Sequence, residues 1–139
     1  MRTRGYSLVE VVAVLAILAV LAALSLPGFR AHILKGRRAE ARDALHAVQL
    51  AQERFRSRSP RYAATLEELA LANTTRSGLY RLRIVQADAT RYLVEAIAQG
   101  SQTSDHPCQL LTLRVEAGTV QTSGSDARGG EQAQACWPQ

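Results

Sequence analysis

The sequence is poor in the residues that catalytic and cofactor sites need. Aromatic residues make up 5% of its 139 positions, which argues against an aromatic cofactor cage or a surface for stacking bases. No GxSxG, HExxH or P-loop spacing occurs in it. His32 and His46 are far apart on one helical stretch, which indicates surface or interface positions rather than metal ligands. We therefore expect no enzymatic activity, no cofactor and no bound metal.

Charge is also missing from one long segment, residues 11–29, which contains no Lys, Arg, Asp or Glu. Val11 to Leu26 alone would rise about 24 Å as a helix, and adding Tyr6 to Val9 brings the length close to the roughly 30 Å hydrocarbon core of a bilayer. Basic residues precede the segment, which would hold this end in the cytoplasm. We expect a single N-terminal membrane helix; a cleaved secretory signal, a passive anchor and a buried core helix are the alternatives.

Glu10 separates these alternatives. A carboxylate near the start of a lipid-embedded helix costs a few kcal/mol on insertion scales, so such residues are usually functional and paired. A secretory signal or a passive anchor has no use for one. The residue therefore favours a helix that meets a charged partner inside the membrane.

The stretch Gly5–Glu10 (GYSLVE), after a short basic leader and before the apolar run, resembles the class III signal of type IV pilins and pseudopilins. The short leader is similar to the type IVa branch. The resemblance implies that prepilin peptidase cuts after Gly5 and methylates the new N-terminus at Tyr6, where the family usually has Phe. It also implies that Glu10 neutralises the α-amine of its own or a neighbouring subunit during assembly, because an unpaired buried charge is costly.

Pro27 stands where the family usually has a proline. Proline removes one helical hydrogen bond and Gly28 adds flexibility, so we expect a kink where the helix leaves the bilayer. We expect the chain to divide into a leader (1–5), a transmembrane and filament-core helix (6–28), an amphipathic helix (29–58), a connecting loop with a short helix (59–78), and a sheet with a disulfide-bonded loop (79–139).

Beyond the proline, apolar residues recur at helical spacing. The repeat every seven residues consists of Leu34, Ala41, Val48 and Phe55, with Ala44, Leu45 and Ala51 on the same face. A helix from about Phe29 to Arg58 with this single stripe to bury is expected. A coiled-coil seam is the weaker alternative, because the stripe contains many alanines.

The same segment is strongly basic. Residues 30–61 hold nine basic residues against three acidic ones, whereas residues 62–139 hold six against eight. A basic helix face of this kind attracts nucleic acid or anionic lipid headgroups. Solvated arginines, or charge contacts between subunits, are the plainer interpretation, so nucleic acid is not the favoured partner.

Strand patterns follow a connector in which Thr65 and Glu68 have the spacing of a helix-capping box. Apolar residues alternate in three runs, which begin at Tyr80, Tyr92 and Leu111, and a turn at residues 116–118 leads into a fourth segment, residues 119–122. A long helix followed by an antiparallel meander of about four strands predicts an α+β fold. The pilin resemblance implies the same layout, with the apolar sheet face on the amphipathic helix.

The chain has two cysteines, Cys108 and Cys136. An outward-facing anchored domain lies where disulfides persist, and closing a loop of roughly 29 residues is worth roughly 3.5 kcal/mol in the chain-entropy model. A metal site of His106 with both cysteines is the alternative, but it lacks a fourth ligand and any CxxC spacing. We expect the disulfide, which falls where the pilin family has its C-terminal disulfide loop.

The segment 51–55 (AQERF), the later strands and the Cys136-Trp137 pair resemble PilE-like minor pilins. This resemblance implies a minor pilin that helps to initiate or adapt a type IV pilus, with roles in twitching motility and adhesion. A major pilin, a DNA-uptake pilin and a type II secretion pseudopilin are the alternatives. Residues 109–135 hold two basic residues against three acidic ones, which argues against DNA capture through the disulfide loop.

The pilin resemblance also implies partners and a location. The partners are other pilin subunits through the N-terminal helix, prepilin peptidase, the assembly platform, and the membrane before assembly. The expected location is the inner membrane, crossed once with the C-terminal domain in the periplasm, and then the extracellular pilus.

Overall fold

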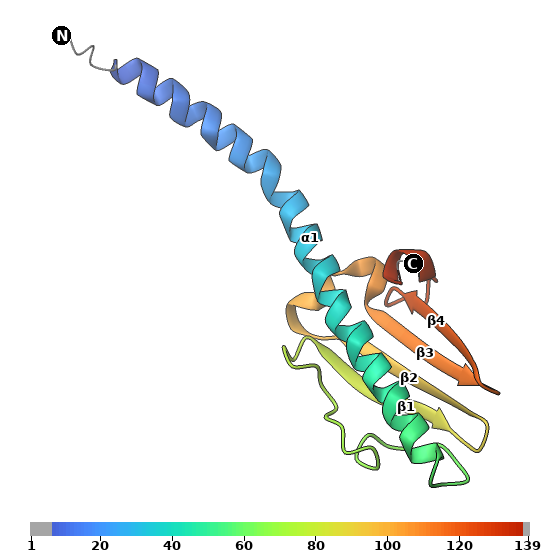
Figure 1. Ribbon diagram of the computed structural model, residues 1–139. Helices are drawn as coiled ribbons and strands as arrows, with labels where there is room; N and C mark the ends of the chain where they lie inside the picture. Colours follow the sequence, from blue (N-terminus) through green and yellow to red (C-terminus); the bar gives the residue numbers. More distant parts are fainter. Residues whose placement is uncertain (1–6, 138–139) are drawn as a thin grey trace. The chain divides into compact units, whose positions relative to one another are not determined.

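The computed structural model describes residues 7–137, except for the side chains of residues 25–27. It contains one long helix, α1 (Leu8–Arg56), followed by a four-stranded antiparallel sheet (Figure 1). The chain divides into two compact units, Met1–Ile33 and Leu34–Gln139.

The first unit consists of the apolar part of α1. Its large hydrophobic side chains are exposed, from 80% for Leu8 to 38% for Ile33. An 18-residue window of α1 has a mean hydropathy of 2.7 and is 0% buried, so α1 is long and apolar enough to cross a membrane. The helix backbone continues through Pro27 and Gly28 without interruption. The expected kink at these residues stays a prediction.

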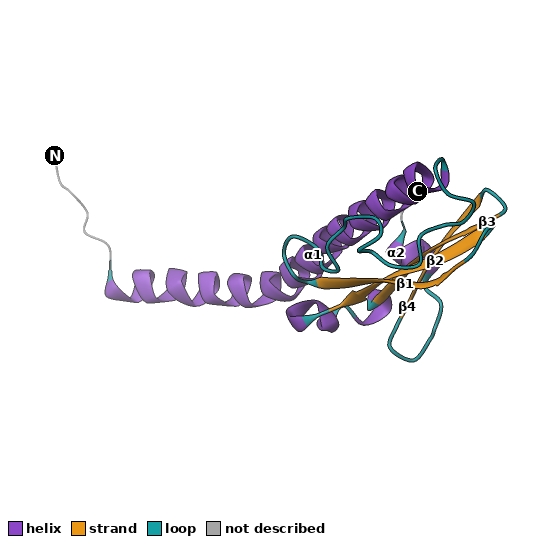
Figure 2. Ribbon diagram, turned by 90° about the horizontal axis from the view of Figure 1, so that it is seen from below, coloured by secondary structure: helices purple, strands orange, loops and turns teal. Residues whose placement is uncertain are grey.

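In the second unit, the rest of α1 lies along one face of the sheet (Figure 2). The strands are β1 (Tyr80–Ala87), β2 (Arg91–Ala98), β3 (Leu110–Glu116) and β4 (Thr119–Ser125), and each pairs with the next along the chain. Ala41, Leu45 and Val48 are fully buried against the inner face, where Tyr80, Tyr92, Val94, Leu111 and Leu113 are also buried. The α+β meander predicted from the alternating pattern is confirmed.

Three details of the helix and connector differ from expectation. The helix ends at Arg56 instead of Arg58, and Phe55 is half-buried because it stacks under the guanidinium of Arg61. Residues 66–70 form a turn instead of a short helix, and residues 61–65 before them are irregular. The Thr65 hydroxyl does accept the Glu68 N–H at 3.3 Å, but Ala70 adopts a left-handed φ of 55°, which ends the turn before a second one can follow.

Gln52 joins α1 to this connector. Its side chain is 0% exposed, and its amide bonds both backbone groups of Ala63: Nε2 donates to the carbonyl at 2.9 Å, and Oε1 accepts the N–H at 2.8 Å. One side chain thus replaces the backbone partners that a strand or helix would provide. The connector is therefore held to the helix by directed bonds as well as by apolar packing.

We expect Gln52→Ala to lower the free energy of unfolding by about 2–4 kcal/mol, because it leaves two buried backbone groups of Ala63 without partners. Urea denaturation of the full-length chain in detergent micelles, followed by far-UV circular dichroism, measures this. Gln49→Ala is the matched control, since Gln49 bonds only the exposed His46, and it should change stability by less than about 0.5 kcal/mol. Equal effects of the two substitutions would contradict the role of Gln52.

Candidate functional site

Of the N-terminal residues predicted to act in processing and assembly, only some lie among the described residues. Gly5 and Tyr6, the predicted cleavage and methylation positions, lie outside the described residues. Glu10 lies in the first turn of α1 and is exposed. An acidic side chain in the first turn interacts favourably with the positive end of the helix. Its carboxylate is therefore free to meet a charged group on another molecule.

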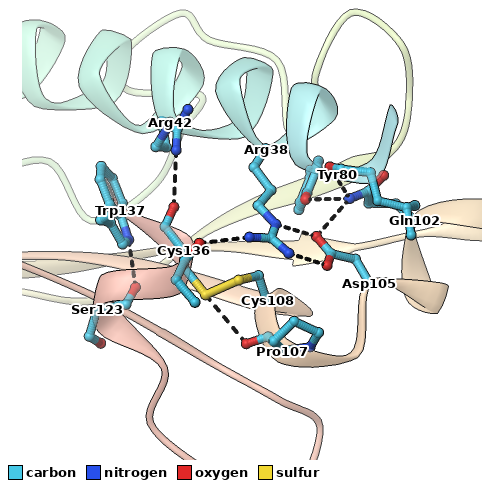
Figure 3. The surroundings of a disulfide bond; sticks show 12 residues. Arg38, Arg42, Tyr80, Gln102, Asp105, Pro107, Cys108, Ser123, Cys136 and Trp137 are labelled. Atoms are coloured by element: carbon cyan, nitrogen blue, oxygen red, sulfur yellow. Dashed lines mark hydrogen bonds and ion pairs between the residues drawn. A yellow bond between two sulfur atoms is a disulfide. The ribbon is translucent and has the colours of Figure 1, made fainter. Parts of the chain in front are cut away.

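A disulfide joins Cys108 and Cys136, as expected, with their Cα atoms 5.6 Å apart (Figure 3). It connects the short helix η2 (His106–Cys108) to α2 (Ala133–Cys136), and both cysteines are 0% exposed. The metal alternative is wrong, because both sulfurs are bonded to each other. Gly124 on β4 faces the bond: a Cβ atom there would lie 2.5 Å from Sγ of Cys136, so only glycine fits.

A buried ion pair holds this disulfide region against α1. Arg38 and Asp105 are 5% and 3% exposed, and the guanidinium binds both carboxylate oxygens, Nε to Oδ2 at 2.6 Å and Nη2 to Oδ1 at 2.5 Å. The third guanidinium nitrogen donates to the Ala135 carbonyl at 2.7 Å. One turn further along α1, Arg42 donates to the Cys136 carbonyl at 3.1 Å (Figure 3). Two helix arginines therefore bind the backbone on the C-terminal side of the disulfide loop.

Gln102 and Tyr80 complete the polar cluster around the carboxylate. Nε2 of Gln102 lies 3.1 Å from Asp105 Oδ2, 3.0 Å from the Tyr80 hydroxyl and 3.1 Å from the Leu34 carbonyl (Figure 3). Burial, reinforced by the negative charge of Asp105, raises the pKa of Tyr80 to about 12. The tyrosine therefore stays neutral and the cluster carries one ion pair.

The prediction that residues 30–61 form one basic face is wrong. Arg38 is buried in the ion pair, Arg42 is bonded to Cys136, and Arg37 donates to Ser101. Arg30 belongs to the other compact unit. The arginines that remain together are those at the C-terminal end of α1, residues 54–61.

We call residues 54–61 (RFRSRSPR) the arginine segment. Two of its arginines lie over aromatic rings: the Cζ atom of Arg56 is 5.7 Å from the Tyr62 ring centroid, and that of Arg61 is 5.6 Å from the Phe55 ring centroid. Arg61 also binds Glu68 with an Nη2–Oε1 distance of 2.7 Å, and this partner, with the Ala64 N–H, lowers the pKa of Glu68 to about 2. The other two arginines, Arg54 and Arg58, are exposed and have no acidic partner among the described residues.

The disulfide loop has the opposite electrostatic character. The Asp126 carboxylate accepts the backbone N–H groups of Arg128 and Gly130 at 2.8 Å each, and these bonds lower its pKa. It therefore remains charged at neutral pH, close to Glu131, which pairs with β4 at Ser125. An excess of acidic residues disfavours contact with phosphate, and that this loop does not capture DNA stays a prediction.

Comparison with family models gives two matches. Residues 27–112 match the model described as type IV minor pilin ComP, DNA uptake sequence receptor. Residues 1–26 match the prokaryotic N-terminal methylation motif. The two matches adjoin at the helix proline and together span the helix and most of the sheet. A search of curated proteins found no similar sequence.

We expect Arg38→Met to lower the free energy of unfolding by about 3–5 kcal/mol, because it leaves the buried Asp105 carboxylate without its counter-charge. Arg37→Met is the matched control, since this neighbour bonds only an exposed hydroxyl, and its effect should stay below about 0.5 kcal/mol. Urea denaturation in detergent micelles measures both. The double substitution Arg38→Met with Asp105→Leu should recover part of the loss. A single substitution no worse than the control would contradict the role of the ion pair.

Proposed function

The chain belongs to the type IV minor pilin family whose model is described as ComP, DNA uptake sequence receptor, and on that premise we propose that it binds double-stranded DNA for uptake. The family match over residues 27–112 is the observation that carries the proposal, because it covers most of the globular unit as well as the helix proline. The charge also supports it: without the leader and its Arg2 and Arg4, 15 basic residues remain against 12 acidic ones, and a basic protein attracts the phosphate backbone over long range.

The architecture supports a role at the surface of a pilus. The N-terminal methylation motif and the exposed apolar half of α1 fit a membrane-anchored pilin that becomes part of the pilus. In our proposal, the helix crosses the inner membrane once and the disulfide-bonded unit lies in the periplasm, where disulfides persist. The exposed apolar helix then packs among the helices of other pilin subunits, in a few copies per filament. The chain acts as a structural and binding subunit, and as a substrate rather than an enzyme.

We propose that processing and assembly use the N-terminal residues in sequence. Prepilin peptidase cuts after Gly5 and methylates the amine of Tyr6. The resulting cation enters an apolar helix bundle, where a lone charge is costly and a hydrogen-bonded pair much less so. Glu10 provides the opposite charge, either in the same subunit or in its neighbour, and thereby selects the register in which the helix enters the filament.

We expect Glu10→Gln to leave cleavage intact but to reduce incorporation into pili several-fold, because the amide cannot neutralise the new amine. Mass spectrometry of the membrane fraction reports the processed N-terminus, and quantitative immunoblotting of sheared pili reports incorporation. Glu10→Asp is the control, since it keeps the carboxylate. Normal incorporation of the glutamine variant would refute the pairing.

The DNA-binding proposal predicts a salt-dependent affinity for duplex DNA. We expect the full-length chain in detergent micelles to bind a labelled mixed-sequence duplex in fluorescence anisotropy, with log K falling linearly against log salt at about −0.9 per phosphate contacted. Empty micelles are the control. Absence of binding at low salt would refute the proposal. Selection from a random duplex pool then shows whether one sequence is preferred.

A further inference from the structure

We propose that the arginine segment is the surface through which this chain holds the phosphates of duplex DNA. Arg54 and Arg58 make the phosphate contacts in this proposal, and the aromatic residue Phe55 positions the site through Arg61. The inference rests on the proposed function of DNA binding, and it locates that function at the end of α1 instead of the disulfide loop.

The local charge is the first argument. The segment contains four arginines and no acidic residue. Basic residues in the last turn of a helix often serve only the negative end of the helix dipole. That explanation covers Arg56, whose Nη1 donates to the Ser59 carbonyl at 3.1 Å just past the helix end. By position it also covers Arg54, but not Arg58, which lies beyond the helix. Both side chains are exposed, and the described residues offer neither of them a hydrogen-bonding or ion-pair partner.

Two acidic residues lie near the segment, and one of them is already paired. Glu68 is held by Arg61 through two bonds, at 2.7 and 3.2 Å. Glu53 precedes the segment and is exposed; its charge adds to the effect of burial in raising the pKa values of Tyr62 and Tyr92. With both acids counted, the four arginines still leave a net positive charge at this end of the molecule.

The stacked pairs make this end of the molecule rigid. Arg56 over Tyr62 and Arg61 over Phe55 cross-link the end of α1 to the start of the connector, and they enclose the turn that carries Arg58 and Pro60. Tyr62 is in turn fixed by an edge-to-face contact with Tyr92, with ring centroids 4.8 Å apart, and by the 2.9 Å bond from its N–H to the Asp88 carbonyl. A site whose backbone is already ordered loses less entropy when it binds.

The same contacts indicate the class of ligand. A free guanidinium matches a phosphate with two parallel hydrogen bonds. Tyr62 is buried and Phe55 half-buried, and each ring has an arginine over one face, so the site offers little aromatic surface on which an unpaired base could stack. The segment therefore suits the phosphate backbone of a duplex better than a single strand, and it contributes affinity without reading bases.

The test is the double substitution Arg54→Gln with Arg58→Gln in the full-length chain in detergent micelles. We expect the salt slope of duplex binding to fall in magnitude by about 2, and the affinity at moderate salt to fall roughly tenfold or more. The control removes the same charge elsewhere: Arg81→Gln with Arg114→Gln changes two exposed arginines of the sheet that have no acidic partner among the described residues. Its slope should change much less.

Phe55→Leu tests the positioning role separately. It removes the ring under Arg61 and keeps every charge, so we expect a several-fold loss of affinity with an unchanged salt slope. If Arg54 and Arg58 are replaced without effect while the wild type binds DNA, the site is wrong and the proposed function stands. If the wild type itself fails to bind, the proposed function is wrong. Unchanged affinity in Phe55→Leu would overturn the positioning role alone.

Discussion

The buried pair of Arg38 and Asp105 is the interaction on which the arrangement of the globular unit depends. Removing two charges from water is costly, and the cost is offset only when geometry is good and the remaining donors are satisfied. Both conditions hold, because the guanidinium binds two carboxylate oxygens and a backbone carbonyl. Apolar packing alone tolerates sliding of one surface over another, whereas these bonds are directional. The pair therefore sets where the disulfide-bonded segment lies along α1.

A small domain with one long helix needs interactions of this kind. The sheet rests on few large apolar side chains of α1, since alanine occupies part of the stripe. Directed bonds at three places compensate: Arg38 at one end, Gln52 at the connector, and the disulfide between η2 and α2. Arg38 and Gln52 join α1 to segments with little regular structure, and the disulfide joins two short helical segments to each other. Segments that the core cannot hold by burial are thus held by hydrogen bonds and one covalent bond.

Much of this fold could be predicted from the sequence, because period-two alternation and the seven-residue repeat directly report which faces are buried. The two residues that were missed, Arg38 and Gln52, both fall on the buried stripe, four residues after Leu34 and four after Val48. A polar residue at a core position is a readable signal. The partners of these two residues cannot be read from the sequence, since Asp105 and Ala63 come next to them only in the tertiary fold. The turn at residues 66–70 was missed because a capping-box spacing indicates how a helix starts but not whether it continues.

The charge pattern of the sequence has the same limitation, because it does not show which partner each charged side chain meets in the fold. The count of charges along residues 30–61 indicates a uniform basic face. Whether an arginine can bind a ligand, however, depends on what its guanidinium group already binds. Arginines near the start of the globular unit bind backbone carbonyls of the disulfide region. At the end of the helix, some arginines lie over aromatic rings and the others are exposed to solvent. A phosphate contact needs a guanidinium whose donors are not already satisfied. The useful quantity for recognition is therefore the number of unpartnered charges on one rigid surface. In the described part of this chain, the end of α1 combines that property with a turn already ordered by its own side chains.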